Sequence, residues 1–396
     1  MTELCAEEFR ERARHKRLKI LYIQLATASF AGIERVVDDV CCALMDDYGD
    51  RFDIDVLYAA DYKDQMPHGR GYNAISVFAP NTLSLLFNAR RIIARTKYDL
   101  IVVPQVEPTV LYWLSSLGLK RRLVMHLHGN PKMEATHLKA KIMFFIMRHV
   151  VLDRLTSVFG TSPKQLQSFR TAFPNKLPHY WVPNPVREFA HIGGGPASDP
   201  DCTTFVNVGR FAYQKGQDIL IDAFAKLYSA RQDVRLKLVG YGANEAALRD
   251  QIARLGLEGV AGIEHHPANP KDALSASDVY VSTSRWEGWS LAICEALRFG
   301  LPVVATDCDF GPSDILIDQR LGRLVPTSDA DALVAAMHYY CDNLKSEKRD
   351  AAYRQAYIDR FSLRQVSRAH ADALRMSAKG ARPDLIAAFP GREAHA

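Results

Sequence analysis

Residues 279–306 read VYVSTSRWEGWSLAICEALRFGLPVVAT, a helical segment enclosed by two short apolar runs. The runs Val279–Ser282 and Val303–Ala305 are largely apolar, which is typical of parallel strands covered on both faces. Ser290 is a preferred N-cap residue, so a helix is predicted from there to about Phe299, before a Gly-Leu-Pro break. A strand, a helix and a strand in this order predict an α/β fold with a parallel sheet.

The same alternation extends along the rest of the chain. Segments with helical apolar spacing, such as 219–227, lie between short apolar runs. At 396 residues the chain is too long for one ordinary core, and the Pro- and Gly-rich stretch Pro183–Pro200 divides it into two α/β domains of similar size. The other candidate strands are Ile20–Leu25, Ile54–Tyr58, Leu100–Val103, Leu123–Leu127, Ser157–Gly160, Phe205–Val208 and Leu236–Val239.

Composition places the chain among globular proteins, with 48% hydrophobic and 24% charged residues. The formal net charge of +5 suits an anionic ligand or a membrane surface without requiring either, and no zinc-finger or RNA-binding motif predicts a nucleic-acid partner. Seven scattered cysteines without a C-x-x-C pair indicate reduced thiols. We predict no signal peptide, because no apolar segment follows the charged N-terminus, and the sequence has no run of about 18–20 apolar residues, so we expect a cytoplasmic protein.

Two basic residues follow the candidate strand Phe205–Val208. They are Arg210 and Lys215, in the segment GRFAYQKG that spans residues 209–216. Ligands of open α/β sheets bind beyond the carboxyl ends of strands, where this pair of cations suits a diphosphate. Two solvated surface cations at a turn are the alternative. Gly240, which follows the next strand, permits close backbone approach but opens no dinucleotide fingerprint.

Two glutamates flank the predicted helix start at Ser290. Glu287 lies in the loop before the helix, and Glu295 lies about one turn inside it, in an apolar stretch. The amides of residues 288–291 and the helix dipole predict an anion site, beside which carboxylates accept hydrogen bonds from vicinal sugar hydroxyls. An ordinary helix-surface position is the alternative for Glu295. A second amide-rich turn, Gly311–Leu316, fits an anion site and ordinary helix capping equally well.

Four Asp-x-Asp strings raise the question of a metal site. Only Asp307–Asp309 follows a buried candidate strand closely enough to contact a ligand. Neighbouring carboxylates without a bound ion are common, and a hard cation needs several oxygen ligands. We therefore predict no metal site.

Together these motifs resemble glycosyltransferase family 4, a group of retaining enzymes with the GT-B fold. The resemblance rests on the segment EGWSLAICE from Glu287 to Glu295 and on the order of the motifs around it, over most of residues 18–377. It implies two Rossmann-like domains that face each other across a cleft, and a nucleotide-sugar donor that is a substrate, with no cofactor. The surrounding motifs are Val182–Val186, Gly209–Gly216, Val239–Gly242 and Gly300–Thr306.

The resemblance implies roles for the matched donor-side residues. Arg210 and Lys215 would bind the donor diphosphate, Glu287 the donor sugar and Glu295 the ribose. The phosphates would lie against the helix amides. The other implied donor-binding residues are Gly240, Gly288, Ser290 and Leu291.

The first half of the chain matches the family at two further positions. Residues 31–36 resemble the family's glycine loop, in which the usual glycine pair is reduced to Ala31-Gly32 and Gly32 keeps the close-approach position. His128, directly after the strand Leu123–Leu127, resembles a histidine that faces the reacting sugar, whereas His126 is expected to face the sheet packing.

The resemblance also implies the domain boundaries. An acceptor-side domain is expected over 1–184 and a donor domain over 185–362. A helix over 363–378 would cross back to the first domain, and a flexible tail would cover 379–396.

The implied activity is transfer of a sugar, with retention, from a nucleotide sugar to a saccharide or lipid-linked saccharide acceptor in bacterial surface-polysaccharide synthesis. Sugar phosphorylase, nucleotide-sugar epimerase and inactive nucleotide-sugar-binding protein are the alternatives. The stretch His137–Val150 mixes basic and large apolar residues. Together with the basic N-terminus and residues 120–122 it suits peripheral docking on the anionic inner face of the cytoplasmic membrane, and a partly buried helix is the alternative.

Overall fold

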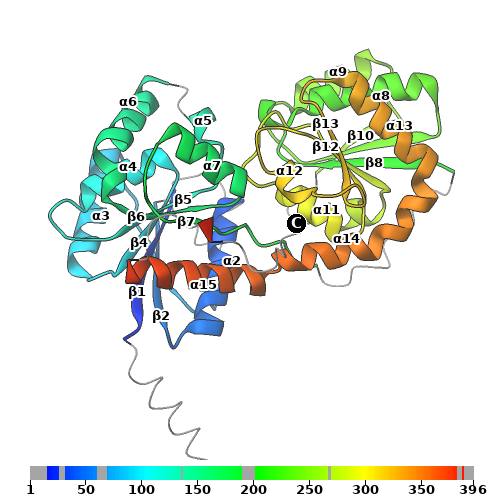
Figure 1. Ribbon diagram of the computed structural model, residues 1–396. Helices are drawn as coiled ribbons and strands as arrows, with labels where there is room; N and C mark the ends of the chain where they lie inside the picture. The colour runs from blue at the N-terminus through cyan, green and yellow to red at the C-terminus, as the bar shows by residue number, and fades with distance from the viewer. Residues whose placement is uncertain are drawn as a thin grey trace, which may run out of the picture. The chain divides into compact units, whose positions relative to one another are not determined.

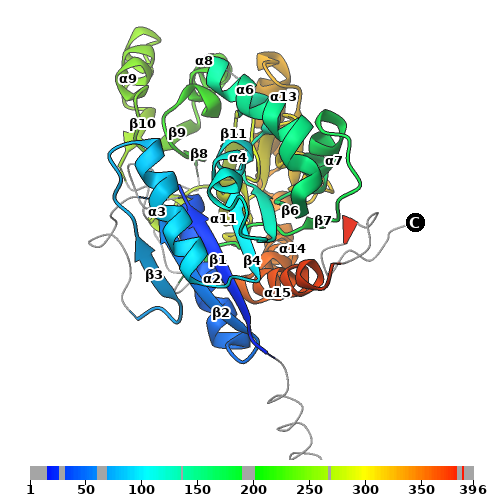
Figure 2. The same ribbon diagram turned by 90° about the vertical axis from the view of Figure 1, so that its left-hand side faces the viewer.

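The chain divides into two compact α/β units. The computed structural model describes residues 16–25, 32–59, 69–134, 137–189, 201–265, 269–380 and 386–387. Unit 1 comprises Met1–Pro185 and Leu363–Ala396, and unit 2 comprises Val186–Ser362. Each unit has its own parallel sheet with helices against it (Figures 1 and 2). The basic residues before position 16 and most of the tail after 379 lie outside the described residues.

Unit 1 is built on an eight-stranded parallel sheet with the strand order β14-β7-β6-β5-β4-β1-β2-β3. Its strands are β1 (Leu18–Gln24), β2 (Phe52–Tyr58), β3 (Asn73–Ser76), β4 (Leu100–Pro104), β5 (Leu123–Leu127), β6 (Leu155–Gly160), β7 (His179–Trp181) and β14 (Ile386–Ala387). The central strands β1, β4 and β5 are almost wholly buried, as strands covered on both faces must be.

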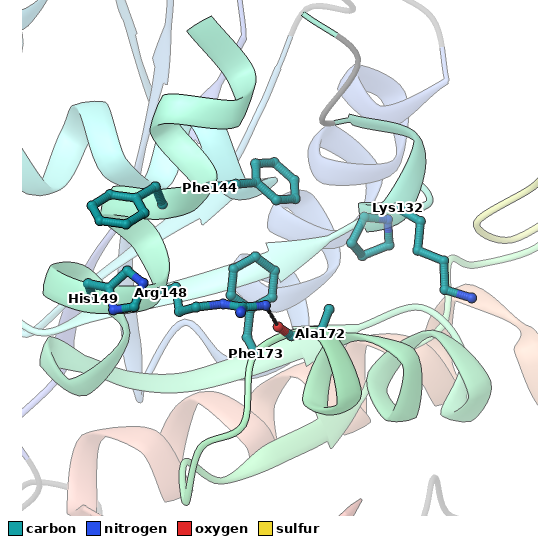
Figure 3. Close-up of a pocket in the computed structure, with 8 residues that line it drawn as sticks. Lys132, Phe144, Arg148, His149, Ala172 and Phe173 are labelled. Carbon is teal, nitrogen blue, oxygen red and sulfur yellow. Dashed lines mark hydrogen bonds between the residues drawn. The ribbon is translucent and has the colours of Figure 1, made fainter. Parts of the chain in front are cut away.

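Helices connect the strands of unit 1, and the last helix of the chain, α15 (Leu363–Lys379), packs against α2. A surface pocket is lined by residues of α5, α6 and α7 (Figure 3). The other helices are α2 (Ile33–Tyr48), α3 (Thr82–Arg95), α4 (Val106–Ser115), α5 (Pro131–Glu134), α6 (Leu138–Ile146) and α7 (Pro163–Ala172), with a π-helical turn η1 (Met147–Val151) and a 3₁₀ turn η2 (Leu152–Arg154) after α6.

Unit 2 has a six-stranded parallel sheet with the order β10-β9-β8-β11-β12-β13. Its strands are β8 (Thr203–Val208), β9 (Val234–Val239), β10 (Ala261–Glu264), β11 (Val279–Ser282), β12 (Val303–Thr306) and β13 (Gly322–Val325). Its α-helices are α8 (Gln217–Ala230), α9 (Glu245–Arg254), α10 (Lys271–Ser275), α11 (Leu291–Arg298), α12 (Pro312–Ile315), α13 (Ala330–Glu347) and α14 (Ala351–Ile358). Its 3₁₀ turns are η3 (Tyr213–Lys215), η4 (Lys348–Asp350) and η5 (Asp359–Phe361).

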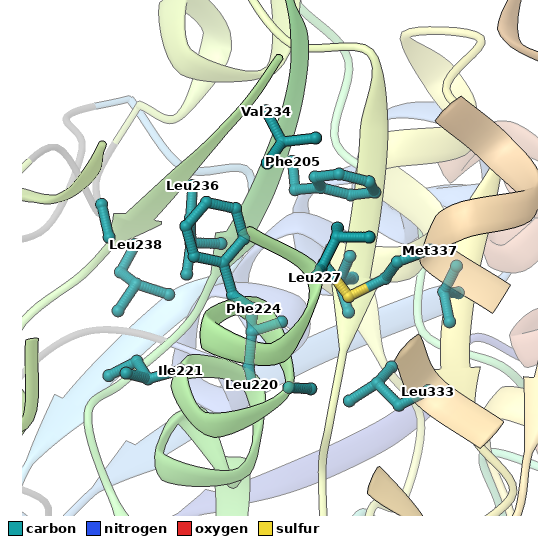
Figure 4. Packing of buried hydrophobic residues seen from close by; sticks show 14 of the residues in the cluster. Phe205, Leu220, Ile221, Phe224, Leu227, Val234, Leu236, Leu238, Leu333 and Met337 are labelled. Atoms are coloured by element: carbon teal, nitrogen blue, oxygen red, sulfur yellow. The ribbon is translucent and has the colours of Figure 1, made fainter. Parts of the chain in front are cut away.

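The core of unit 2 forms where α8 and α13 cover the sheet (Figure 4). Phe224 and Leu227 of α8 meet Phe205 and Leu236 of the strands, and Met337 of α13 closes the cluster. These side chains are essentially inaccessible to solvent, and burial of each contributes on the order of 1.5–3 kcal/mol. This packing holds the carboxyl ends of β8, β9 and β11 in fixed positions.

The predicted fold class, α/β with two parallel sheets, is confirmed. All nine candidate strands are present, with ends that move by at most two residues. Five strands had no counterpart in the sequence analysis: β3, β7, β10, β13 and β14. Four of these lie at sheet edges, where one side is not covered by another strand, so a continuous apolar run is not required.

Candidate functional site in unit 2

The loops that follow β8 and β9 are joined closely by glycines. The amide of Gly209 donates to the carbonyl of Val239 at 2.9 Å, and the amide of Phe211 donates to that of Tyr241 at 2.8 Å. A Cβ on Gly240 would lie only 2.0 Å from the carbonyl oxygen of Gly209. The close backbone approach predicted for Gly240 is therefore an approach to the neighbouring loop of the protein, at Gly209.

The loop that follows β11 is joined to the β8 loop through Gly216. This residue has φ +63°, and a Cβ there would lie 2.2 Å from the carbonyl oxygen of Thr283. The hydroxyl of Thr283 donates to the Gly216 carbonyl at 2.8 Å, and the amide of Arg285 donates to the carbonyl of Gln214 at 2.7 Å. Only glycine combines this left-handed backbone with so close an approach.

The joined loops bring Lys215 and Glu287 together, 72 residues apart in sequence. The Lys215 Nζ lies 2.7 Å from Glu287 Oε1, and the hydroxyl of Ser284 donates to the same oxygen at 2.6 Å. Glu287 is buried and the Lys215 side chain is about a quarter exposed. The pair thus presents a fixed cation at the carboxyl edge of the sheet, with a carboxylate held beside it.

Arg210 lies in the same loop as Lys215 and is exposed to solvent. Its guanidinium makes no hydrogen bond or ion pair with any residue that the structure describes. An arginine in this state keeps all five of its N–H donors for a ligand, which suits bidentate binding of a phosphate.

Helix α11 begins at Leu291, with Ser290 at its N-cap. Gly288 and Ser290 are buried and Leu291 is half-buried. Within this described region no side chain caps the helix, because the hydroxyl of Ser290 makes no capping hydrogen bond. The first-turn amides of this eight-residue helix are therefore suited to an anion, as predicted for the loop that contains Glu287.

Glu295 is buried in α11, and Arg187 is its ionic partner. The Arg187 Nε lies 3.5 Å from Glu295 Oε1. The Arg187 guanidinium also lies over the ring of Phe189 at 5.6 Å. Arg187 was not among the sequence-predicted site residues. The signal that points to it is indirect: a carboxylate in an apolar stretch needs a partner, and Arg187 is a cation just beyond the Val182–Val186 motif.

Gly32 and His128 belong to unit 1. Gly32 is the N-cap of α2 with φ +54°, and no described atom lies within 4 Å of a Cβ built there; Ala31 lies outside the described residues. His128 follows β5 directly and is buried, which lowers its pKa to about 4. Its ring centroid lies 4.0 Å from that of His126, which is buried in the sheet packing as predicted.

The remaining sequence candidates have ordinary structural contacts. The amide of Gly311 donates to Asp314 Oδ2 at 3.2 Å, so the Gly311–Leu316 turn caps its own short helix. Within the described ranges, no group of three or more His, Cys, Asp or Glu side chains is arranged to hold a metal ion. No described helix combines the length and the apolarity that a membrane span requires.

Part of the chain is similar in sequence to known glycosyltransferases. Residues 195–358 match the family model "Glycosyl transferases group 1". The chain is 35% identical over 116 residues to an uncharacterized glycosyltransferase of Methanocaldococcus jannaschii, covering 29% of each protein. It is 31% identical over 144 residues to a lipopolysaccharide core biosynthesis mannosyltransferase of Rhizobium meliloti, covering 34% of this chain and 40% of that one. The matched parts thus span 29% and 40% of these two curated relatives.

The fold comparison covers both units. The crystal structure of Anabaena HepE in complex with UDP and glucose aligns with a TM-score of 0.73 and 21% identity, over 91% of this chain and 100% of that one. The expected GT-B fold, with two Rossmann-like α/β domains, is therefore confirmed. The sequence relatives are named as glycosyltransferases, which agrees with the resemblance recognised in the motifs.

Proposed function

We propose that this chain, whose residues 195–358 match glycosyl transferases group 1, moves a hexose from a nucleoside diphosphate sugar to a saccharide or lipid-linked saccharide acceptor. The observation that carries the proposal is the Lys215–Glu287 pair, with the exposed Arg210 in the same loop as Lys215. A pyrophosphate requires fixed cations and amides, and a sugar requires a fixed carboxylate. Unit 2 offers all of these at the carboxyl edge of one sheet.

The donor is assigned to unit 2 residue by residue. Arg210, Lys215 and the first-turn amides of α11 bind the diphosphate. Glu287 accepts hydrogen bonds from the donor sugar, and Glu295, held by Arg187, accepts them from the ribose. The crystal structure of the Anabaena protein in complex with UDP and glucose supports this class of donor.

The proposed reaction proceeds with retention of the anomeric configuration. The bond between the sugar C1 and the β-phosphate oxygen breaks, while a bond forms from C1 to the acceptor oxygen on the same face. The acceptor proton passes to the leaving phosphate oxygen. Arg210, Lys215 and the α11 amides stabilise the negative charge that develops on the diphosphate, and this stabilisation favours the transition state over the bound donor.

Unit 1 is assigned to the acceptor side of the reaction. Because burial lowers the pKa of His128 to about 4, its imidazole is neutral at pH 7 and serves as a hydrogen-bonding group for the reacting sugar. Gly32 lies at the start of α2, and the absence of any described atom within 4 Å of a Cβ built there supports the approach of a ligand to its backbone. Because His128 is neutral and Gly32 has no side chain, neither residue adds a charge at the reacting centre.

The unit-1 surface also supports peripheral association with the inner face of the cytoplasmic membrane. On α6 the large apolar side chains of Leu138, Ile142 and Phe145 are exposed, and Lys139 and Lys141 are exposed between them. Apolar groups interleaved with lysines suit an anionic lipid surface. Recovery of the protein in the soluble fraction after flotation with anionic liposomes would contradict this association.

A thermal-shift panel of nucleoside diphosphates and their sugars tests the proposed activity. A ligand at 100 times its Kd stabilises the protein by about 2.7 kcal/mol, so the correct nucleotide is expected to stand out from the panel. Product analysis by NMR, with and without an acceptor, then separates transfer from epimerisation, phosphorolysis and binding without turnover. A product of inverted anomeric configuration would disprove the retaining mechanism, and no stabilisation by any nucleotide would disprove the donor site.

A further inference from the structure

The outer face of α3 carries exposed apolar and basic side chains in one stripe. Leu83 is 79% exposed and Phe87 is 63% exposed, and the exposed Arg91 follows one turn later. A spacing of four residues places these side chains on the same face of the helix. The opposite face, which includes Ala89 and Ile93, is buried. α3 therefore has an ordinary inward apolar face and, in addition, an outward face that combines large apolar groups with a cation.

The stripe continues onto the end of α4, which packs against α3 (Figure 2). The guanidinium of Arg90 on α3 donates to the carbonyl of Leu117 at 2.8 Å and to that of Ser115 at 3.2 Å. Leu114 and Leu117 are both exposed at this junction. We call this surface the α3–α4 patch, and it consists of Leu83, Phe87, Arg90, Arg91, Arg95, Leu114 and Leu117.

The two stretches of chain that form the patch are basic throughout. Residues 78–98 contain four Lys or Arg, residues 108–122 contain three, and neither stretch contains Asp or Glu. Among the described residues, the hydrogen bonds of Arg90, Arg121 and Arg122 go to carbonyl oxygens, and none of these seven cations forms an ion pair. The positive charge of this surface is therefore not neutralised by a described carboxylate.

The combination of charge and apolar surface favours one kind of partner. A second copy of the chain would bring two positively charged faces together, which is unfavourable. A nucleic acid would use the arginines through its phosphates but would leave the exposed leucine and phenylalanine side chains without a role. An anionic bilayer uses both, because apolar groups enter the boundary of the acyl chains while Lys and Arg bind the lipid phosphates.

We propose that the α3–α4 patch docks unit 1 on a bilayer that contains anionic phospholipid, with Leu83 and Phe87 inserted at the boundary of the acyl chains and Arg91 at the phosphates. This inference rests on the peripheral membrane association in the proposed function and assigns that association to a surface other than α6. The patch belongs wholly to unit 1, to which the acceptor is assigned. Docking through it would bring the acceptor-side unit to the surface in which a lipid-linked acceptor resides.

Flotation of the full chain with vesicles of defined composition measures the docking. With vesicles of equal parts phosphatidylglycerol and phosphatidylcholine the chain is expected to float, because anionic headgroups attract the cations of the patch. With phosphatidylcholine alone it is expected to stay in the soluble fraction. A rise in salt concentration is expected to weaken the binding to anionic vesicles, since exposed charges are screened.

Two variants of the patch have controls in unit 2. Phe87→Ser is expected to weaken partitioning onto anionic vesicles at least about tenfold, and Arg91→Gln about fivefold. Leu255→Ser removes a leucine that is 38% exposed, and Arg254→Gln removes an exposed arginine in the last turn of α9, so both controls are expected to bind as the unaltered chain does. Phe145→Ser removes an equally exposed phenylalanine from α6 and tests that surface. Equal thermal unfolding midpoints establish that the variants are folded.

Weakened flotation of both patch variants, with normal flotation of the unit 2 controls, supports the inference. Weakening in only one patch variant overturns it, because insertion and headgroup binding are required together. Dependence on Arg91 alone would assign the patch to a polyanion such as a nucleic acid. Normal flotation of both patch variants also overturns it, and a simultaneous loss in Phe145→Ser would leave the association with α6.

Absence of flotation by the unaltered chain overturns both the patch and the peripheral association. The thermal shift produced by nucleoside diphosphates is measured on the same variants and is expected to be unchanged, since the patch and the donor site lie in different units. A failure of the donor site is thereby distinguished from a failure of docking.

Discussion

Lys215 Nζ and Glu287 Oε1 lie 2.7 Å apart, although they come from loops after two different strands. The hydroxyl of Ser284 donates to the same carboxylate oxygen, so Glu287 has two partners and Lys215 keeps hydrogen-bonding capacity. A buried carboxylate fixes the position of the cation before any ligand binds. This arrangement provides preorganised positive charge without the cost of ordering a free lysine side chain.

Replacement of Lys215 by Gln is expected to lower kcat about 100-fold, because a fixed charge beside the leaving diphosphate is lost. Stability should fall as well, because the buried carboxylate of Glu287 loses its cation, although it retains its hydrogen bond from Ser284. Steady-state kinetics of sugar transfer measure kcat for the variant and for the unaltered chain. Lys226→Gln on α8, which removes an exposed lysine paired with Asp331, is the control and should leave kcat unchanged. A Lys215→Gln enzyme with normal kcat would refute the proposed role.

Substitution of Arg210 is expected to change ligand binding with almost no change in stability. Because its side chain is exposed and its guanidinium makes no bond to a described residue, Arg210→Gln should change the free energy of unfolding by no more than about 0.5 kcal/mol. The same change should remove most of the thermal shift that a nucleoside diphosphate produces. Arg254→Gln, an exposed arginine in the last turn of α9, should retain the full shift. Equal shifts in both variants would exclude Arg210 from the donor site.

The strands that sequence analysis located and those it missed differ in their surroundings. β11 and β12 are covered on both faces and by neighbouring strands, so their apolar runs are visible in the sequence. β13 reads GRLV and lies at an edge, where glycine and arginine are tolerated. β3, at the edge of the other sheet, is mostly exposed. The apolar run thus detects most central strands, although it misses the three-residue β7, and it does not detect the ends of a sheet.

The residues of the candidate site likewise fall into those that the sequence predicts and those that it does not. Glycines and charged residues directly after strands are readable from the order of elements, so Arg210, Lys215 and Glu287 were named from sequence. The contact between Arg187 and Glu295 joins residues 108 positions apart (295 − 187) and depends on packing that no local pattern encodes. Gly32 and His128 were named through resemblance to the family, and their proposed roles stay predictions.

Gly216 is expected to tolerate no side chain. Gly216→Ala would place a Cβ 2.2 Å from the carbonyl oxygen of Thr283 on a backbone with φ +63°. Strain in this backbone region alone costs about 1–3 kcal/mol, and the clash adds to it. Urea unfolding should therefore show a clear loss of stability. Gly262→Ala, where no described atom lies within 4 Å of the added Cβ and φ is outside the left-handed region, should stay close to the unaltered chain. Equal stability of the two variants would contradict the described junction.

Acid should destabilise unit 1 through three buried histidines. His126 lies in β5, His128 follows that strand directly, and His370 belongs to α15. The ring of His126 lies close to both others, with its centroid 5.4 Å from that of His370. Burial lowers the pKa of His128 to about 4 and that of His370 to about 3, and lowers that of His126 well below 6.5. These rings are neutral in the folded state, whereas in the unfolded chain they bind protons below about pH 6.5.

The sign of the pH dependence follows from that difference. Because the folded pKa values are depressed, the unfolded state binds more protons between about pH 6.5 and 4, so the stability present above pH 6.5 falls as the pH falls. Each such histidine contributes about 1.4 kcal/mol per pH unit. Burial raises the pKa of Asp39 to about 6, which acts in the opposite direction, so the comparison must be made against a variant. His370→Gln should reduce the slope of unfolding free energy against pH, measured by urea unfolding from pH 7 to 5. Identical slopes for the variant and the unaltered chain would show that His370 is already protonated, or exposed, in the folded protein.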